Sequence, residues 1–150
     1  MKAVIQRVSE ASVLIDSNIK GKISTGYLIL LGIAEDDNQE DISWLCNKIN
    51  NLRIFSDKEG KMNLNLSDVN GEILLISQFT LHAKTKKGNR PSYTKAAKPE
   101  IAVPLYNKFI STMNEILNSE IQTGEFGANM KVSLVNDGPV TIIIDTKNKE

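Results

Sequence analysis

A single histidine and a single cysteine limit the side-chain chemistry open to this chain of 150 residues. His82 follows an apolar segment that carries the hydroxyls of Ser77 and Thr80. Because histidine is the most frequent general base, this spacing permits a Thr80–His82 hydrolase, although a surface histidine at a strand end is the more common explanation. Cys46 lies on the apolar stripe of a predicted helix, where a free cysteine usually packs as a small hydrophobe. One cysteine and one histidine cannot complete a zinc site, and we expect neither a metal nor a cofactor.

A basic segment runs from His82 to Lys95 and contains no acidic residue. Its cations are Lys84, Lys86, Lys87, Arg90 and Lys95. Nucleic-acid phosphates would bind such a loop favourably, and Tyr93 offers a ring on which a base could stack. The formal net charge of the chain is zero, so the cluster is a local asymmetry. A solvated lysine-rich loop would have the same composition, and both interpretations stay open.

Composition indicates an ordinary globular domain, with 41% apolar and 24% charged residues. One cysteine cannot form a disulfide within the chain, which is typical of the reducing cytoplasm. The segment from Met1 to Arg7 meets a polar residue too early for a signal peptide. No apolar run approaches the roughly 20 residues that span a bilayer. We therefore expect a cytoplasmic protein that does not associate with membranes.

Hydrophobic periodicity predicts strands at residues 4–8, 12–15, 27–34, 52–55, 72–81, 131–135 and 140–145. Asp37 or Asn38 can cap a helix whose apolar face contains Ile42, Leu45, Cys46, Ile49 and Leu52. A second helix begins at Pro99 or Pro104 and buries Leu105, Phe109, Met113, Ile116 and Leu117. These elements predict one α+β domain over residues 1–150, with antiparallel or mixed sheet and two main helices. Residues 146–150 are expected to be a frayed tail.

Two segments carry a more specific signal than their composition. Ser77-Gln78-Phe79-Thr80-Leu81 and Asn136-Asp137-Gly138-Pro139-Val140-Thr141 resemble the two signature segments of the D-aminoacyl-tRNA deacylase family. Further similar segments follow in order along nearly the whole chain, at residues 6–8, 52–55, 60–64, 90–92, 96–97 and 124–130. Two positions beside the first segment depart from the family pattern. His82 stands where a tyrosine is expected, and Lys84 where an acidic residue is expected.

The resemblance implies a barrel-like sheet core in a homodimer with two active sites at the subunit interface. It implies hydrolysis of the ester that joins a D-amino acid to the terminal adenosine of tRNA. Glycine mischarged onto tRNA would also be removed, and L-aminoacyl-tRNA would be rejected. Two other classes remain open from the residues alone: an RNA-binding module without catalysis, and a Thr80–His82 esterase for small molecules.

Catalytic roles follow from the same resemblance. Ser77, Gln78 and Phe79 would form the floor of the pocket. The backbone N–H groups near Phe79 and Thr80 would face the scissile carbonyl as preorganised donors. The Thr80 hydroxyl is one candidate nucleophile, but without an adjacent base such a hydroxyl is weak. The 2′-hydroxyl of the terminal adenosine is the other candidate, and we favour it.

Binding roles also come from the resemblance. Gly138-Pro139 would be a cis dipeptide that crosses from the partner subunit and reads chirality, with Arg7 holding it in place. Ala102 and Met130 would line the pocket. Contacts to tRNA phosphates are expected from Lys84, Lys86, Lys87 and Arg90.

Overall fold

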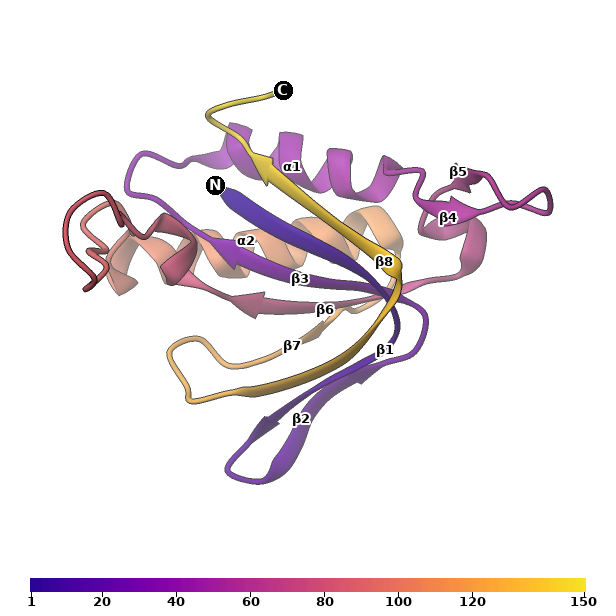
Figure 1. The fold of residues 1–150 in the computed structure, drawn as a ribbon, viewed down its shortest axis with the longest axis horizontal. Helices are drawn as coiled ribbons and strands as arrows, with labels where there is room; N and C mark the ends of the chain where they lie inside the picture. Colours follow the sequence, from indigo (N-terminus) through magenta and orange to yellow (C-terminus); the bar gives the residue numbers. More distant parts are fainter.

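The central strand of the molecule is β1 (Lys2–Ile15), which alternates buried and partly exposed side chains along most of its length. Such a period of two is typical of a strand with one face on a core. The computed structural model describes residues 1–150. In it, the first half of β1 pairs antiparallel with β3 (Gly26–Gly32), and its other side pairs antiparallel with β8 (Lys131–Asp145). β1 thus connects the two halves of the sheet (Figure 1).

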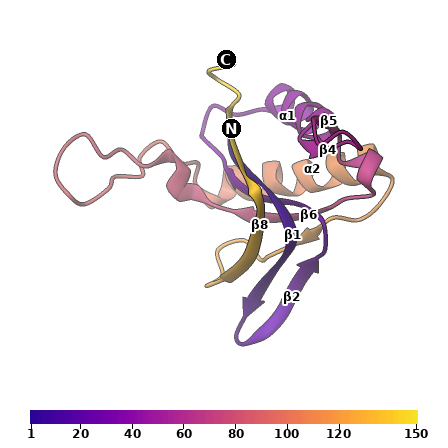
Figure 2. The ribbon, with the colours of Figure 1, turned by 45° about the vertical axis from the view of Figure 1, so that its right-hand side comes forward.

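The remaining strands make the sheet mixed. β2 (Asn18–Ile23) pairs antiparallel with the second half of β1, while β6 (Glu72–Ser77) and β7 (Gln122–Thr123) extend the sheet in parallel beyond β3. The strand order is β2-β1-β3-β6-β7, with β8 on β1. The sheet curls strongly, so β2 and the first half of β8 swing round below β6 and β7 (Figures 1 and 2). The predicted α+β fold with a mixed, barrel-like sheet is confirmed.

Two helices cover the upper part of the sheet (Figure 2). α1 (Gln39–Asn51) begins after Asn38, whose side chain accepts hydrogen bonds from the backbone of the first turn, as predicted. α2 (Pro99–Leu117) begins at Pro99 and contains Pro104 as its sixth residue. The prediction that the helix begins at Pro99 or Pro104 is confirmed for Pro99, and Pro104 lies inside the helix. Its missing N–H falls only one turn after the start, where a single lost bond disturbs the helix least.

Several predicted strand boundaries are wrong. The strand expected at 72–81 ends at Ser77, and a short 3₁₀ turn, η2 (Phe79–His82), follows. The strands expected at 131–135 and 140–145 are one strand, which pairs with β1 up to Asn136 and again from Thr141, with a shift of register between. Residues 52–54 are not in a strand, and only β4 (Phe55–Ser56) pairs, with β5 (Met62–Leu64). A 3₁₀ turn, η1 (Ser67–Val69), connects β5 to β6. None of the helices has the length and apolar character needed to cross a membrane.

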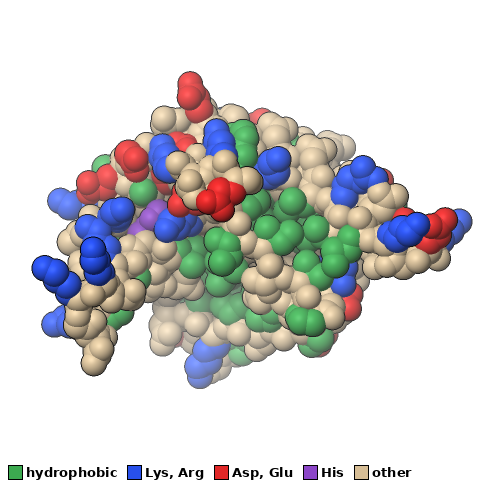
Figure 3. Space-filling model, turned by 45° about the horizontal axis from the view of Figure 1, so that its top comes forward, with side chains coloured by type: hydrophobic (Ala, Val, Ile, Leu, Met, Phe, Trp, Pro, Cys, Tyr) green, Lys and Arg blue, Asp and Glu red, His purple; other side chains and the backbone are tan.

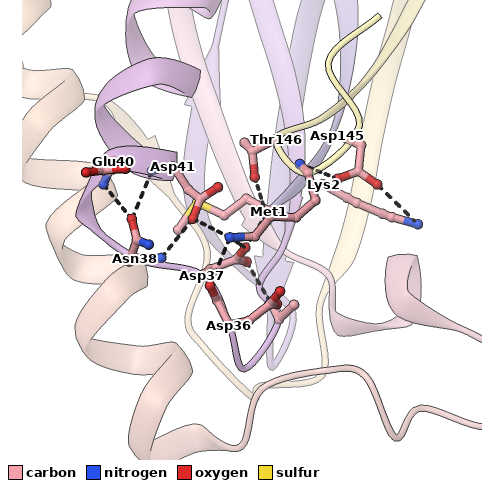
Figure 4. A network of polar contacts seen from close by, with 11 residues as sticks. Met1, Lys2, Asp36, Asp37, Asn38, Glu40, Asp41, Asp145 and Thr146 are labelled. Carbon is pink, nitrogen blue, oxygen red and sulfur yellow. Dashed lines mark hydrogen bonds and ion pairs between the residues drawn. The ribbon is translucent and has the colours of Figure 1, made fainter.

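Both ends of the chain meet beside the start of α1 (Figure 4). The amino group of Met1 donates hydrogen bonds to Asp37 at 2.5 Å and to the Thr146 hydroxyl at 2.6 Å. Lys147 pairs with Asp41 at 2.8 Å. The expectation of a frayed tail is therefore wrong for Thr146 and Lys147, because these contacts hold them against the domain.

The ion pair of Asp41 with Lys147 should make the stability of the fold depend on pH in acid. Burial opposes ionisation of Asp41, but hydrogen bonds from Lys147 and from the backbone of Asn38 outweigh it and lower its pKa to about 2. A depressed pKa stabilises the fold above the unfolded value, and this contribution is lost as the pH falls from about 4 to about 2. Urea unfolding should show the free energy of unfolding decreasing across this window. The decrease should be smaller in Asp41→Asn, and equal slopes in both proteins would contradict the assignment.

Candidate active site

The site forms where β6 stops pairing with β3. The N–H of Gln78 donates to the carbonyl of Leu31 at 2.8 Å, and the chain then turns. Within η2, the first amide that donates along the turn is that of Leu81, which reaches the Gln78 carbonyl at 3.2 Å. The N–H groups of Phe79 and Thr80 precede it and have no partner within the turn, as at any helix start. Two backbone donors are thus available at the end of a rigid strand.

Gly32 allows this turn to lie close against β3. A Cβ at this position would come within 3.0 Å of both the Gln78 carbonyl oxygen and the Leu81 Cβ, and within 3.1 Å of the His82 ring. A larger residue would therefore push η2 away from the sheet. The sequence places Gly32 inside an apolar strand, but its partners lie some 46 to 50 positions later, so the spacing alone does not reveal the contact.

A cavity of about 280 Å³ opens beside the turn. It is lined by five of the predicted site residues: Ser77, Gln78, Phe79, Ala102 and Met130. Another part of the wall comes from residues 126–129, which the sequence analysis did not single out as pocket residues. The signal for them was the similarity of segment 124–130 to the family. The volume lies just below the roughly 300–1,000 Å³ of most small-molecule sites, and most of the lining is apolar.

Thr80 and His82 do not form a catalytic pair. The Thr80 hydroxyl accepts a hydrogen bond from the Gln78 side chain at 2.6 Å, and Thr80 does not line the cavity. His82 is only 7% exposed, so its interpretation as a surface histidine is also wrong. Its Nε2 has no hydrogen-bond partner, and the residue lines a separate cavity of about 510 Å³. Within η2, Phe79 lines the first cavity and His82 lines the second, so His82 does not face the cavity beside β6.

Arg7 contacts the segment that contains Gly138-Pro139. The peptide bond between Gly138 and Pro139 is cis. Nε of Arg7 donates to the Asp137 carbonyl at 2.7 Å, and Nη1 donates to the Ile54 carbonyl at 2.5 Å. Gly138 has φ +144°, and a Cβ there would lie 2.9 Å from Nη2 of Arg7. None of these residues lines the cavity of its own chain.

The basic segment forms a projecting loop between η2 and α2 (Figure 2). Its four predicted tRNA-binding cations, Lys84, Lys86, Lys87 and Arg90, are all exposed, and lysine and arginine side chains gather at this end of the molecule (Figure 3). Cys46 is fully buried, and burial raises its pKa to about 12. Because the thiolate is the reactive form, Cys46 is a packing residue, as the sequence favoured. No group of three or more His, Cys, Asp or Glu side chains could hold a metal ion.

Comparison with known proteins identifies the family of the chain. The sequence model of the D-Tyr-tRNA(Tyr) deacylase family matches residues 4–145. The chain belongs to this family. A D-aminoacyl-tRNA deacylase of Flavobacterium psychrophilum is 67% identical over 150 residues, with both chains covered completely. One from Bacteroides thetaiotaomicron is 64% identical, again over the full length of both chains.

Two solved structures share the fold of this chain. The c-Myc DNA Unwinding Element Binding Protein superposes with a TM-score of 0.91 at 40% identity, covering 97% of this chain and 98% of that one. A protein described as a probable eukaryotic D-amino acid tRNA deacylase superposes with a TM-score of 0.83 at 15% identity, covering 95% and 97%. The second likeness shows that the deacylase fold persists at low sequence identity.

Proposed function

We propose that this protein is a cytoplasmic hydrolase that cleaves D-aminoacyl-tRNA into free D-amino acid and tRNA, without a cofactor. Glycine mischarged onto tRNA is a second substrate, and L-aminoacyl-tRNA is rejected. The observation that carries the proposal is the cavity of aminoacyl size, lined by Ser77, Gln78 and Phe79 at the point where two backbone donors are free. Membership of the deacylase family supports the same reaction.

The chemistry we propose uses backbone groups. The N–H groups of Phe79 and Thr80 bind the carbonyl oxygen of the ester and stabilise the negative charge that develops there. The Thr80 hydroxyl has no base beside it, and its recorded contact is with the Gln78 amide. An unassisted hydroxyl is a poor nucleophile. We therefore assign the assisting role to the 2′-hydroxyl of the terminal adenosine, which lies next to the ester in the substrate itself.

Chirality, in this proposal, is read across a dimer interface. Arg7 bonds to the Asp137 carbonyl next to Gly138-Pro139, and the dipeptide does not line the cavity of its own chain, so we assign it to the cavity of a second copy. β8 is paired on one side only, by β1, and exposes apolar side chains, with Val135 at 50% and Ile143 at 73%. An open apolar strand edge is a ready surface for association. A backbone carbonyl from the partner would exclude an L side chain, while glycine and D-residues would pass.

The basic loop is assigned to the tRNA backbone. Lys84, Lys86, Lys87 and Arg90 are exposed on a segment with no acidic residue, which attracts phosphates although the whole chain is neutral. The ring of Tyr93 in this loop packs against Phe79, which lines the cavity, so the base of the loop lies beside the cavity. This arrangement suits a substrate whose ester enters the cavity while its polynucleotide remains outside.

A deacylation assay tests the function. We expect release of D-tyrosine from D-tyrosyl-tRNA and no measurable release from L-tyrosyl-tRNA. His82→Ala and Thr80→Ala should keep most of the activity, whereas tRNA ending in 2′-deoxyadenosine should be cleaved poorly. A loss of about a hundredfold in His82→Ala, the scale of general-base catalysis, would favour a Thr80–His82 esterase. Binding of tRNA without any release would indicate an RNA-binding module.

Light scattering tests the dimer. The wild type should have twice the mass of the 16.6 kDa chain at micromolar concentration. Ile143→Lys should shift the protein towards the monomer and lower its deacylase activity in parallel, since a charge on the strand edge opposes pairing. Ile19→Lys, the same change at another exposed apolar residue outside β8, 63% exposed on β2, should leave the mass unchanged. A fully active monomer would overturn the shared site.

Salt dependence tests the loop. Replacing Lys84, Lys86 and Lys87 together by Gln should weaken tRNA binding and lower the log–log slope of affinity against salt. Each lost phosphate contact should lower it by roughly 0.7–0.9. The matched control replaces Lys20, Lys22 and Lys58, which are also exposed, and should bind like the wild type. Equal slopes for the two triple variants would show that the loop is merely solvated.

A further inference from the structure

Two aromatic side chains are exposed side by side at the border between the cavity and the basic loop. Phe79 is 55% exposed and Tyr93 is 37% exposed, and their ring centroids lie 5.0 Å apart at an interplanar angle of 73°. This edge-to-face arrangement is favourable, but the rings leave much apolar surface in water. Phe79 lines the cavity, whereas Tyr93 does not. The pair therefore extends from the cavity towards the outside.

Tyr93 is held in this place by the base of the loop. The backbones of Lys84 and Ser92 exchange two hydrogen bonds, of 2.7 and 3.1 Å, and the Lys84 ammonium donates to the Thr94 hydroxyl at 2.9 Å. On the other side, the N–H of Ala97 donates to the Ile33 carbonyl at 2.9 Å. The loop is thus closed just before Tyr93 and anchored to the sheet just after it. The cationic tip lies beyond this closure.

We propose that the Phe79–Tyr93 pair is a stacking platform for the terminal nucleobase of the substrate, with Tyr93 as a positioning residue. The proposal rests on the proposed deacylase function. From the cavity outwards, the surface offers an apolar pocket, then two aromatic rings, then lysines and arginine. An aminoacylated 3′ end presents an amino acid, then a nucleoside, then phosphates. Aromatic faces bind bases by stacking, which makes the middle zone the complement of the nucleoside.

Binding without hydrolysis gives the sharpest test. The probes are 3′-deoxy-3′-(D-tyrosylamido)adenosine, whose amide resists hydrolysis, and the same compound with hydrogen in place of the base. Calorimetry should show that Tyr93→Ala weakens binding of the adenosine probe by about 5- to 150-fold, which corresponds to roughly 1–3 kcal/mol of stacking. Tyr93→Phe should bind it like the wild type. The base-free probe should bind equally to all three proteins.

Two further measurements distinguish a failure of the stacking platform from a failure of the deacylase proposal. Ile19 is another exposed apolar residue, and it lies on β2, far from Tyr93 in the sequence. Ile19→Ala should leave binding of the adenosine probe unchanged. With the D-tyrosyl ester of adenosine, Tyr93→Ala should raise KM and leave kcat near the wild-type value. Tyr93-dependent binding without hydrolysis by the wild type would refute the deacylase and keep the platform. Three outcomes would overturn the platform. They are hydrolysis that does not depend on Tyr93, no binding of the adenosine probe, and an equal loss of affinity for both probes in Tyr93→Ala.

Discussion

The candidate site depends on one constraint, which is that β6 must stop pairing at Ser77 while remaining rigid up to that residue. Gln78 makes the last sheet bond, to the Leu31 carbonyl, and the next two amides find no partner in the turn. Backbone donors without partners are normally costly inside a protein, so they persist where water or a substrate can accept from them. Gly32 permits the turn to lie against β3, since any Cβ there would press on the Gln78 carbonyl and the Leu81 side chain. The cavity, the aromatic pair and the basic loop all follow from where this turn directs the chain.

Local patterns explain which elements were predictable. The helix at 39–51 has apolar residues at helical spacing and a capping asparagine, and both signals act within one or two turns. The run from Tyr27 predicts a strand buried on both faces, and β3 is such a strand. In contrast, Phe79 to Leu81 has strand-like composition, yet it turns because Gly32 and the loop anchor at Ile33 lie beside it. Residues 136–139 have turn composition, yet β8 continues because β1 pairs with it on both sides of residues 137–140, with shifts of register between Gln6 and Glu10.

The site was predictable to the extent that family motifs mark it. The signature segments name the floor of the cavity and the Gly138-Pro139 dipeptide, and both are found where backbone geometry is unusual. Composition could not show that His82 is buried, because its ring packs near Gly32, a residue 50 positions earlier. The wall formed by residues 126–129 depends likewise on the path of the chain after α2, which no local pattern determines. The order of pocket, aromatic rings and cations becomes visible only when β6, the loop and α2 are placed together.

The proposed chemistry assigns its decisive contacts to backbone groups, and this explains what the surrounding side chains do. N–H groups at 79 and 80 would bind the ester, and carbonyls near Gly138 would exclude the L side chain. Neither group can rotate away as a side chain can, and neither loses side-chain rotamer freedom when a substrate binds. Arg7 and Gln78 then fix where the backbone lies, through hydrogen bonds of 2.7 Å to the Asp137 carbonyl and 2.8 Å to the Leu31 carbonyl, and Gly32 leaves room for it. A site of this kind selects a substrate by its stereochemistry at the α-carbon and is indifferent to which D side chain points away from it.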